Sequence, residues 1–174
     1  MIRSKSDPLL TGAKAVLILI GTLFMFVLVI LAIGLGAILT VERGELMERI
    51  AEFDAPVSLY WLVICAFALL IGIFAALLRF LHLLMQMIKS VEAGDPFVPA
   101  NADRLHKMGW LTLGIQAALM ILWGFDKLVL QYVDNTGLDF SFSLSGWFLA
   151  LVLFILARVF RHGTDLRAEV EGTV

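Results

Sequence analysis

The side chains that could do chemistry are few, and the three histidines come first. His82, His106 and His162 could bind haem or a metal ion if they lay on facing helices, because helical bundles host such sites. No two of them share ligand spacing within one helix, and no cysteine or cluster of carboxylates lies beside them. We therefore predict that the protein holds no cofactor and no metal, with a histidine-bound haem or metal ion as the alternative.

Other polar side chains give no indication of catalysis or transport. The sequence contains no nucleophile paired with a base, no phosphate loop and no dinucleotide fingerprint, so we predict that the protein is not an enzyme. Inside the apolar runs the strongly polar residue is Gln116, while Asp126 and Lys127 lie near the end of the same run and are interpreted as interfacial. Transporters place charges or broken helices near the membrane midplane, so we do not expect transport.

Four apolar runs account for most of the chain and must position these residues. They cover residues 15–41, 55–78, 108–125 and 140–157. Each is long enough, at roughly 1.5 Å per residue, to cross a hydrocarbon core about 30 Å thick. Because an unpaired backbone amide in lipid costs several kcal/mol, each segment must be helical. We predict an all-α membrane protein, a single four-helix transmembrane domain over residues 1–174.

Composition supports a bilayer environment. Of the 174 residues, 61% are hydrophobic and 16% are charged, whereas soluble proteins contain about 25% charged residues. The mean hydropathy is +0.97. The net charge of −2 argues against direct binding of nucleic acid, because such proteins carry basic patches. The single cysteine, Cys65, lies in an apolar run and is interpreted as a small hydrophobic side chain.

Basic residues predict the orientation, since cytoplasmic loops carry an excess of lysine and arginine. The two sides of the predicted bundle differ clearly. Basic residues on the first side, in both termini and in the 79–107 segment, are Arg3, Lys5, Lys14, Arg79, Lys89, Arg104, Lys107, Arg158, Arg161 and Arg167. Those on the other side are Arg43, Arg49 and Lys127. We therefore predict that both termini and the 79–107 segment are cytoplasmic.

The 79–107 segment is predicted to extend the second and third helices into a cytoplasmic hairpin. Four polar residues recur at spacings of three and four and so share one helix face: Arg79, His82, Gln86 and Lys89. The reversal is predicted at Gly94-Asp95-Pro96. Asn101 is interpreted as the N-cap of the third helix, with Asp103 in its positive first turn. Two interpretations explain this segment equally well. It is either a solvated connector or a rigid tip that offers side chains to a partner or to anionic headgroups, namely Phe97, Arg104, His106 and Lys107.

The C-terminal tail, residues 158–174, is the second polar region on that side. Gly163 is interpreted as a helix C-cap, and Leu166 belongs to a short amphipathic stretch that could dock another helix. Membrane anchoring by snorkelling is the favoured interpretation of Arg158, whereas the roles of Arg161 and Arg167 stay open.

On the opposite side, Leu46, Ile50 and Phe53 predict an interfacial helix, and the alternation around Phe140 and Phe142 predicts a short extended segment. Small residues four apart, which let helices approach closely, recur in all four runs. They are Ala32, Gly36 and Thr40; Ala68, Gly72 and Ala76; Gly114 and Ala118; and Gly146 and Ala150. Packing within the bundle is the default role, and a homo-oligomer is the alternative.

Both polar regions resemble parts of an uncharacterised bacterial family of small four-span membrane proteins, catalogued as a domain of unknown function. The hairpin matches its G-x-P-F…N…R-L…G core at Gly94, Pro96-Phe97, Asn101, Arg104-Leu105 and Gly109. The tail resembles the family's ending at Phe160-Arg161, Gly163, Leu166-Arg167, Glu169 and Thr173-Val174. Gly172 and a short first external loop depart from the pattern. The family has no established activity, and its genes commonly lie beside one for a short helix-turn-helix regulator.

The resemblance thus implies a multi-pass protein of the bacterial inner membrane that is coupled to a transcription factor. The preferred hypothesis is a regulatory or sensory module that docks a small cytoplasmic helix-turn-helix regulator through the 94–109 tip and the tail. The expected binding residues are Asp95, Pro96, Phe97, Asn101, Arg104, Lys107, Arg161, Leu166 and Arg167. The alternative is the haem- or metal-binding bundle that would use the three histidines, and a purely structural scaffold is the third hypothesis.

Overall fold

The computed structural model describes residues 8–41, 43–52, 56–130, 132 and 144–172. Five helices follow one another: α1 (Pro8–Thr40), α2 (Arg43–Glu52), α3 (Ser58–Glu92), α4 (Pro99–Val129) and α5 (Leu144–Gly172). No strand occurs in the described part of the chain, which confirms the all-α prediction. The extended segment expected around Phe140 and Phe142 lies outside the described residues.

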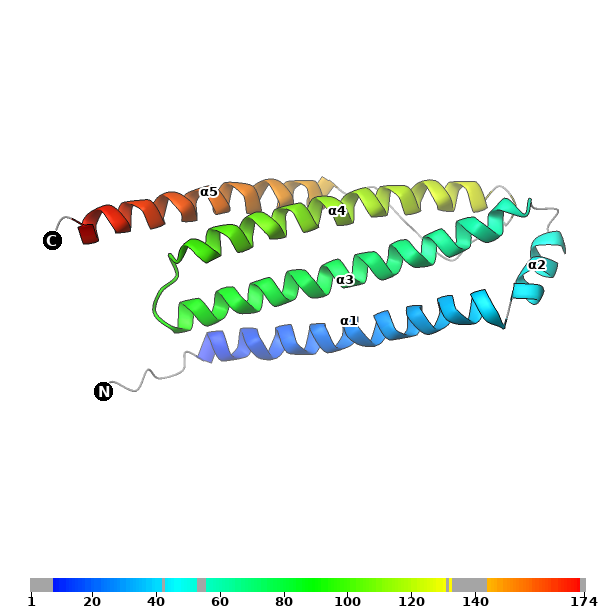
Figure 1. Cartoon of the computed structure of the whole chain (residues 1–174), viewed down its shortest axis with the longest axis horizontal. Coiled ribbons are helices and arrows are strands. Elements are labelled where there is room, and N and C mark those ends of the chain that lie inside the picture. The colour runs from blue at the N-terminus through cyan, green and yellow to red at the C-terminus, as the bar shows by residue number, and fades with distance from the viewer. Residues whose placement is uncertain (1–7, 42, 53–55, 131, 133–143, 173–174) are drawn as a thin grey trace.

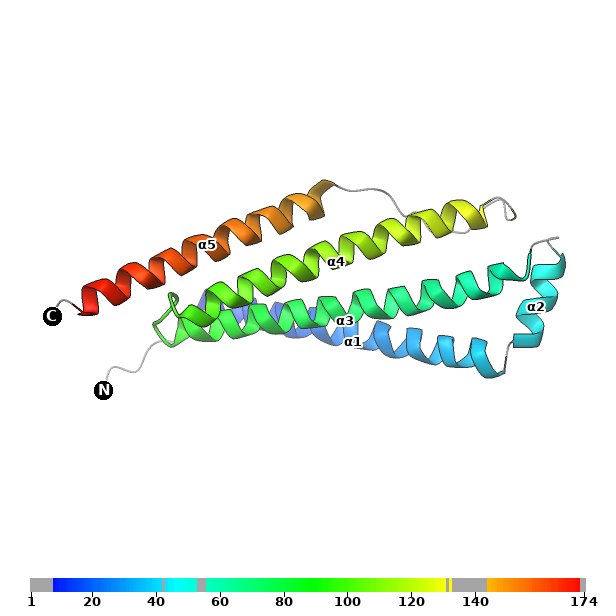
Figure 2. The same cartoon turned by 45° about the horizontal axis from the view of Figure 1, so that its top comes forward.

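The four long helices lie lengthwise beside one another, and α2 lies across one end of them (Figures 1 and 2). α1 packs on α3, α3 packs on α4, and α4 packs on α5 most extensively. The start of α1, the turn between α3 and α4, and the end of α5 all lie at the end opposite α2 (Figure 1). We call this the tip end.

All four long helices are long and apolar enough to cross a membrane. Large apolar side chains cover their outer surfaces, and Leu19 of α1 is 71% exposed. In water such continuous apolar surface would be a severe liability, whereas a bilayer solvates it and requires helices. The protein is therefore a multi-pass integral membrane protein. Each helix extends beyond its predicted apolar run mainly toward the tip end, so the polar parts of the four helices lie together there.

The buried core also lies toward the tip end. It joins α3, α4 and α5 through five tightly packed side chains: Leu83, Leu105, Met108, Leu153 and Ala157. Gly109 allows close approach here, since a Cβ at this position would lie 2.9 Å from the ring of Phe154. Gly146 similarly leaves room for Gln116 of α4. Glycines 109 and 146 thus serve packing inside the bundle at the α4–α5 contact.

The reversal between α3 and α4 occurs where the sequence predicts it. Gly94 has a φ of +81°, a left-handed conformation that favours glycine. The Gly94 amide donates to the carbonyl of Val91, and the Asp95 amide donates to the carbonyl of Ser90. These two bonds form the Schellman motif that ends a helix at such a glycine. Because the motif directs the chain back at once, α3 and α4 form the predicted helical hairpin.

Two predictions about helix ends are wrong. α4 begins at Pro99 with Val98 as its N-cap, so Asn101 is not the cap and Asp103 lies beyond the first turn. Proline suits the first helical position because the amide it lacks would have no partner there. α5 does not end at Gly163 but continues to Gly172. Tertiary contacts made by the side chain of Asn101 and by the surface at Gly163, described below, explain both differences.

The interfacial helix predicted on the other side corresponds to α2, which contacts α1 and α3. Ile50 is buried against the bundle and Leu46 is partly buried, while Phe53 lies outside the described residues. An i, i+4 ion pair joins Arg49 to Glu45 on the exposed face, with 2.9 Å between Nη2 and Oε1. The polar and apolar residues of α2 therefore lie on different faces of the helix, as their spacing predicts.

Candidate partner-binding site at the tip end

Asn101 lies at the centre of a polar network that closes the α3–α4 hairpin. Its side chain has no exposed surface. The amide nitrogen donates to Ser90 Oγ at 2.6 Å and to the carbonyl of Pro96 at 2.8 Å, and the amide oxygen accepts from Arg104 Nη1 at 2.7 Å. Burial of an amide is tolerable only when its hydrogen bonds are satisfied, and here three are made. Asn101 thus ties both helices to the turn.

Arg104 extends the network across the hairpin. Its Nε donates to Gln86 Oε1 on α3 at 3.1 Å, while Nη1 contacts Asn101. Gln86 Nε2 lies 2.9 Å from His82 Nε2, one turn earlier on the same helix. The polar face predicted for α3 is therefore directed in part at α4 rather than wholly at solvent. Arg104 fixes the register of the two helices because its fork-shaped guanidinium holds two partners at once.

Phe97 joins the turn to α5. Its ring lies against Phe160, with 5.3 Å between ring centroids, and a Cβ at Gly163 would lie 3.0 Å from Phe97 Cδ1. The hydroxyl of Thr164 donates to the backbone carbonyl of Phe97 at 3.0 Å. Gly163 is therefore a packing position inside a continuous helix. Phe97 as a residue remains 43% exposed, so part of it is accessible.

Two ion pairs connect the same segments. Arg167 Nη1 of α5 lies 2.5 Å from Asp95 Oδ1 in the turn, and Arg161 Nη2 lies 2.7 Å from Asp103 Oδ1 of α4. All four side chains are at least one-third exposed, so water screens these pairs, and each contributes at most about 1 kcal/mol. We call the contacts between residues 95–103 and residues 160–167 the tip–tail interface.

A further ion pair at this end joins Lys14 of α1 to Glu92 of α3. Both side chains are about 30% exposed. Farther from the tip end, α1 packs along α3 through apolar side chains, and Phe24 meets Phe74 edge to face with 5.6 Å between ring centroids. The ion pair therefore fixes the polar end of α1 beside the end of α3.

The structure thus brings together most of the residues expected to bind a partner. Pro96 and Asn101 lie within the turn network, and Asp95, Phe97 and Arg161 lie in the tip–tail interface. Lys107 and Leu166 differ, because both are exposed and neither side chain takes part in that network or interface.

Sequence reasoning missed Asp103, Phe160 and Thr164, which also form the interface. The Thr164 hydroxyl gave no pattern signal, whereas the charge of Asp103 beside the polar hairpin could have indicated an ion pair.

The three histidines do not form a ligand set. His82 contacts Gln86, whereas His106 packs edge to face against Trp110 and Phe154 of α4 and α5. Within the described part of the chain, no three His, Cys, Asp or Glu side chains gather where they could hold a metal ion. The geometry therefore gives no specific support to the haem or metal hypothesis.

Polar residues within the spans are accommodated by the bundle. Gln116 occupies the space beside Gly146, and Thr112 donates to the carbonyl of Met108 one turn earlier at 2.9 Å. Asp126 is 9% exposed and faces the packed interior near the end of α4. Lys127 lies 5.9 Å from the centre of the Trp123 ring, a cation–π contact suited to a membrane boundary.

Four candidate membrane-spanning helices with a polar hairpin at one end define a small multi-pass membrane protein. The chain belongs to the family described as "Protein of unknown function (DUF2975)", which matches residues 45–174. This match covers α3, α4, α5 and most of α2, and so includes every residue of the tip–tail interface. Comparison with curated proteins and with solved structures found no match. The predicted membership of a family of four-span proteins of unknown function is confirmed.

Proposed function

We propose that this protein is a regulatory module whose tip end lies in the cytoplasm and docks a small helix-turn-helix DNA-binding protein. One observation carries the proposal. Two segments more than fifty residues apart in sequence, each with exposed charged and apolar side chains, form one surface through the tip–tail interface. That surface offers Phe97 and Leu166, 43% and 51% exposed, among the cations Arg161 and Arg167. Exposed aromatic and arginine side chains are typical of protein-binding surfaces.

The interface is also suited to regulation, because its strength is modest. Beyond Phe160, which packs against the buried core, the end of α5 is held on the hairpin by two screened ion pairs, a hydrogen bond from Thr164 and the ring of Phe97. Such a contact can open at small cost in free energy, whereas the hairpin network around Asn101 is buried and persists. α5 is one continuous helix from the span into the interface, so a displacement within the membrane moves the docking surface directly.

Binding, rather than catalysis, is the activity we propose. A partner held at the inner membrane would be kept from its DNA, and a membrane signal that opens the interface would release it. The protein itself need not contact nucleic acid, which agrees with its net charge of −2. The family resemblance supports this choice of partner, because a gene for a short helix-turn-helix regulator commonly lies beside the genes of that family.

Co-purification of the full chain with the product of the adjacent regulator gene tests the proposal. We expect capture to fall when the Asp95–Arg167 pair is broken by Asp95→Arg or by Arg167→Asp, because the docking surface loses its arrangement. The reciprocal double variant restores opposite charges and should recover capture. Arg158→Gln, which removes an exposed arginine of α5 outside the interface, serves as the matched control and should capture normally.

Two further variants extend the test. Arg104→Ala removes the guanidinium that orders the hairpin, and deletion of residues 163–174 removes the end of α5. Both should lose the partner while the protein remains in the membrane fraction. If capture is unchanged in both variants and in Asp95→Arg, the tip end is not the docking surface and the proposal fails.

A further inference from the structure

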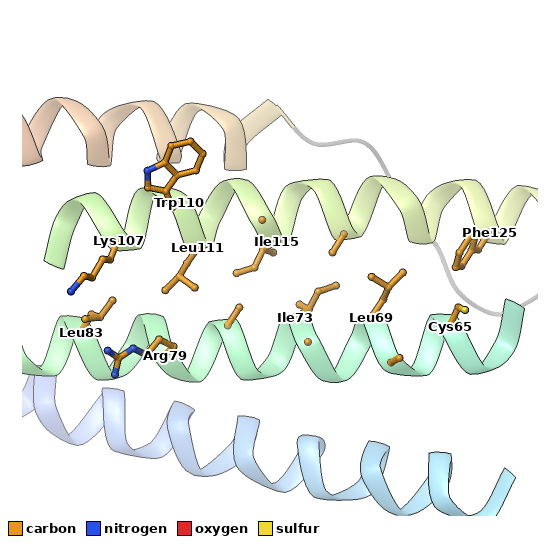
Figure 3. A pocket seen from close by; sticks show the side chains of 15 residues that line it. Cys65, Leu69, Ile73, Arg79, Leu83, Lys107, Trp110, Leu111, Ile115 and Phe125 are labelled. Carbon is orange, nitrogen blue, oxygen red and sulfur yellow. The ribbon is translucent and has the colours of Figure 1, made fainter. Parts of the chain in front are cut away.

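A groove runs between α3 and α4 on the membrane-facing side of the bundle, with a volume of about 860 Å³ (Figure 3). That volume lies within the roughly 300–1,000 Å³ usual for small-molecule sites. Apolar side chains line its length, among them Leu69, Ile73, Leu111 and Ile115. Gly72 and Gly114 lie on opposite walls, and a Cβ at either would meet no other atom within 4 Å. The small-residue stripes of α3 and α4 therefore border open space rather than a tight helix contact.

Two cations lie at one end of the groove. Arg79 of α3 and Lys107 of α4 line it, and both side chains are exposed. Figure 3 shows the two side chains at the same end of the gap between the helices. Within the described residues, neither makes an ion pair, a hydrogen bond or a ring contact. The groove thus combines long apolar walls with two unpaired positive charges, those of Arg79 and Lys107, at one end.

The position of these cations relative to the bilayer follows from the sequence. No charged residue occurs between Ser58 and Leu78 of α3, or between Met108 and Phe125 of α4. At about 1.5 Å per residue, each uncharged stretch spans roughly the 30 Å of a hydrocarbon core. Arg79 and Lys107 therefore lie where hydrocarbon gives way to lipid headgroups. A cation at this depth is stabilised by an anionic headgroup.

We propose that the α3–α4 groove binds one anionic phospholipid. An acyl chain lies along the apolar walls past Gly72 and Gly114, and the phosphate group contacts Arg79 and Lys107. Charge complementarity favours an anionic lipid over a zwitterionic one, whose own ammonium group would face the same two cations. This inference does not depend on the docking function proposed above.

A second copy of the chain fits the groove less well. At the level of Arg79 and Lys107, the charged residue that flanks α5 is Arg158, whereas Lys14 of α1 lies farther toward the tip end. Lys14 already pairs with Glu92. A helix from a second molecule in the same orientation would therefore place either another cation or no charge beside Arg79 and Lys107. It would not neutralise these two unpaired cations. Like charges at that depth repel, and the carboxylate that precedes Lys107 by one turn on α4, Asp103, already pairs with Arg161.

Native mass spectrometry of the full chain tests the lipid proposal. The protein is purified in detergent with equal amounts of phosphatidylglycerol and phosphatidylcholine of the same chain length, and the lipids retained per molecule are identified. We expect one retained lipid, with phosphatidylglycerol preferred. Arg79→Gln and Lys107→Gln should each lower that preference about fivefold, corresponding to about 1 kcal/mol per basic residue near the headgroups. Arg158→Gln, an exposed arginine outside the groove, should leave it unchanged.

Substitutions that fill the groove with a side chain test the lipid proposal independently. Gly72→Leu and Gly114→Leu place side chains in open space and should abolish lipid retention without loss of helicity. Gly36→Leu, at an equally open position on α1 outside the groove, is the matched control. Equal retention of the two lipids by the wild-type protein overturns the proposal, as does an effect of Arg158→Gln as large as that of Arg79→Gln. A dimer that Gly114→Leu dissociates would assign the groove to a second copy instead.

Discussion

Replacing Asn101 by alanine should open the α3–α4 hairpin at the tip end. The substitution removes three hydrogen bonds at once: two donated to Ser90 and Pro96, and one accepted from Arg104. The site has no exposed surface, so water cannot replace the amide without rearrangement of the turn. The Ser90 hydroxyl, which donates to the carbonyl of Met87, would lose the donor that it accepts from.

The expected loss of stability follows from those three bonds. A neutral hydrogen bond contributes about 0.5–1.5 kcal/mol net, and one to a charged group about 1.5–3 kcal/mol, so the sum is roughly 2.5–6 kcal/mol. Arg104 is partly exposed and regains some hydration when its partner is lost. We therefore expect Asn101→Ala to lower the free energy of unfolding by about 3 kcal/mol, within the lower half of that range.

Reversible unfolding of the full chain in mixed micelles, followed by circular dichroism and tryptophan fluorescence, measures this loss. Ser90→Ala removes one of the three bonds and should cost about 1 kcal/mol. Asn101→Asp keeps the acceptor for Arg104 but cannot donate to Ser90 or to the Pro96 carbonyl, so it should also destabilise the protein. The reasoning is refuted if Asn101→Ala costs no more than Ser90→Ala, or if Asn101→Asp is as stable as the wild-type protein.

Three other predictions follow from the packing and the charges. Gly109→Ala should destabilise the bundle by about 1–3 kcal/mol, because its methyl group would press on the Phe154 ring, whereas Gly114→Ala, at an open position, should cause no loss in the same unfolding assay. Arg161→Ala should cost less than about 1 kcal/mol, because its pair with Asp103 is largely exposed; a larger loss would show that the pair is shielded from water. Reporter fusions at the two termini should both be active in the cytoplasm; periplasmic activity at either end would overturn the predicted orientation.

Much of the architecture could be predicted from local rules. Lipid leaves a spanning segment no alternative to the helix, so four apolar runs were enough to predict four long helices. Gly94-Asp95-Pro96 was enough to predict the hairpin, because a helix that ends in a left-handed glycine reverses within a few residues. These features depend on the hydrogen bonding and transfer energy of one segment at a time.

The candidate site was only partly predictable, because it depends on contacts between segments that are distant in the sequence. The chain contains several cations and carboxylates near the tip end, and no spacing rule pairs Asp95 with Arg167 or Asp103 with Arg161. These pairings require α5 to pack along α4 and to continue past Gly163. Local helix-ending rules favoured a stop at Gly163, whereas the Phe97 ring occupies the space that a side chain there would need.

The sequence by itself determined that this chain crosses a membrane, how many helices do so and where its polar residues gather, because burial in lipid and backbone hydrogen bonding constrain each segment separately. Only the tertiary structure decided what those polar residues do. Asn101, which local rules place at a helix start, is instead a buried connector, because its amide finds three partners from α3, the turn and α4. Packing of the helices selects such partners, and that choice depends on contacts between distant segments.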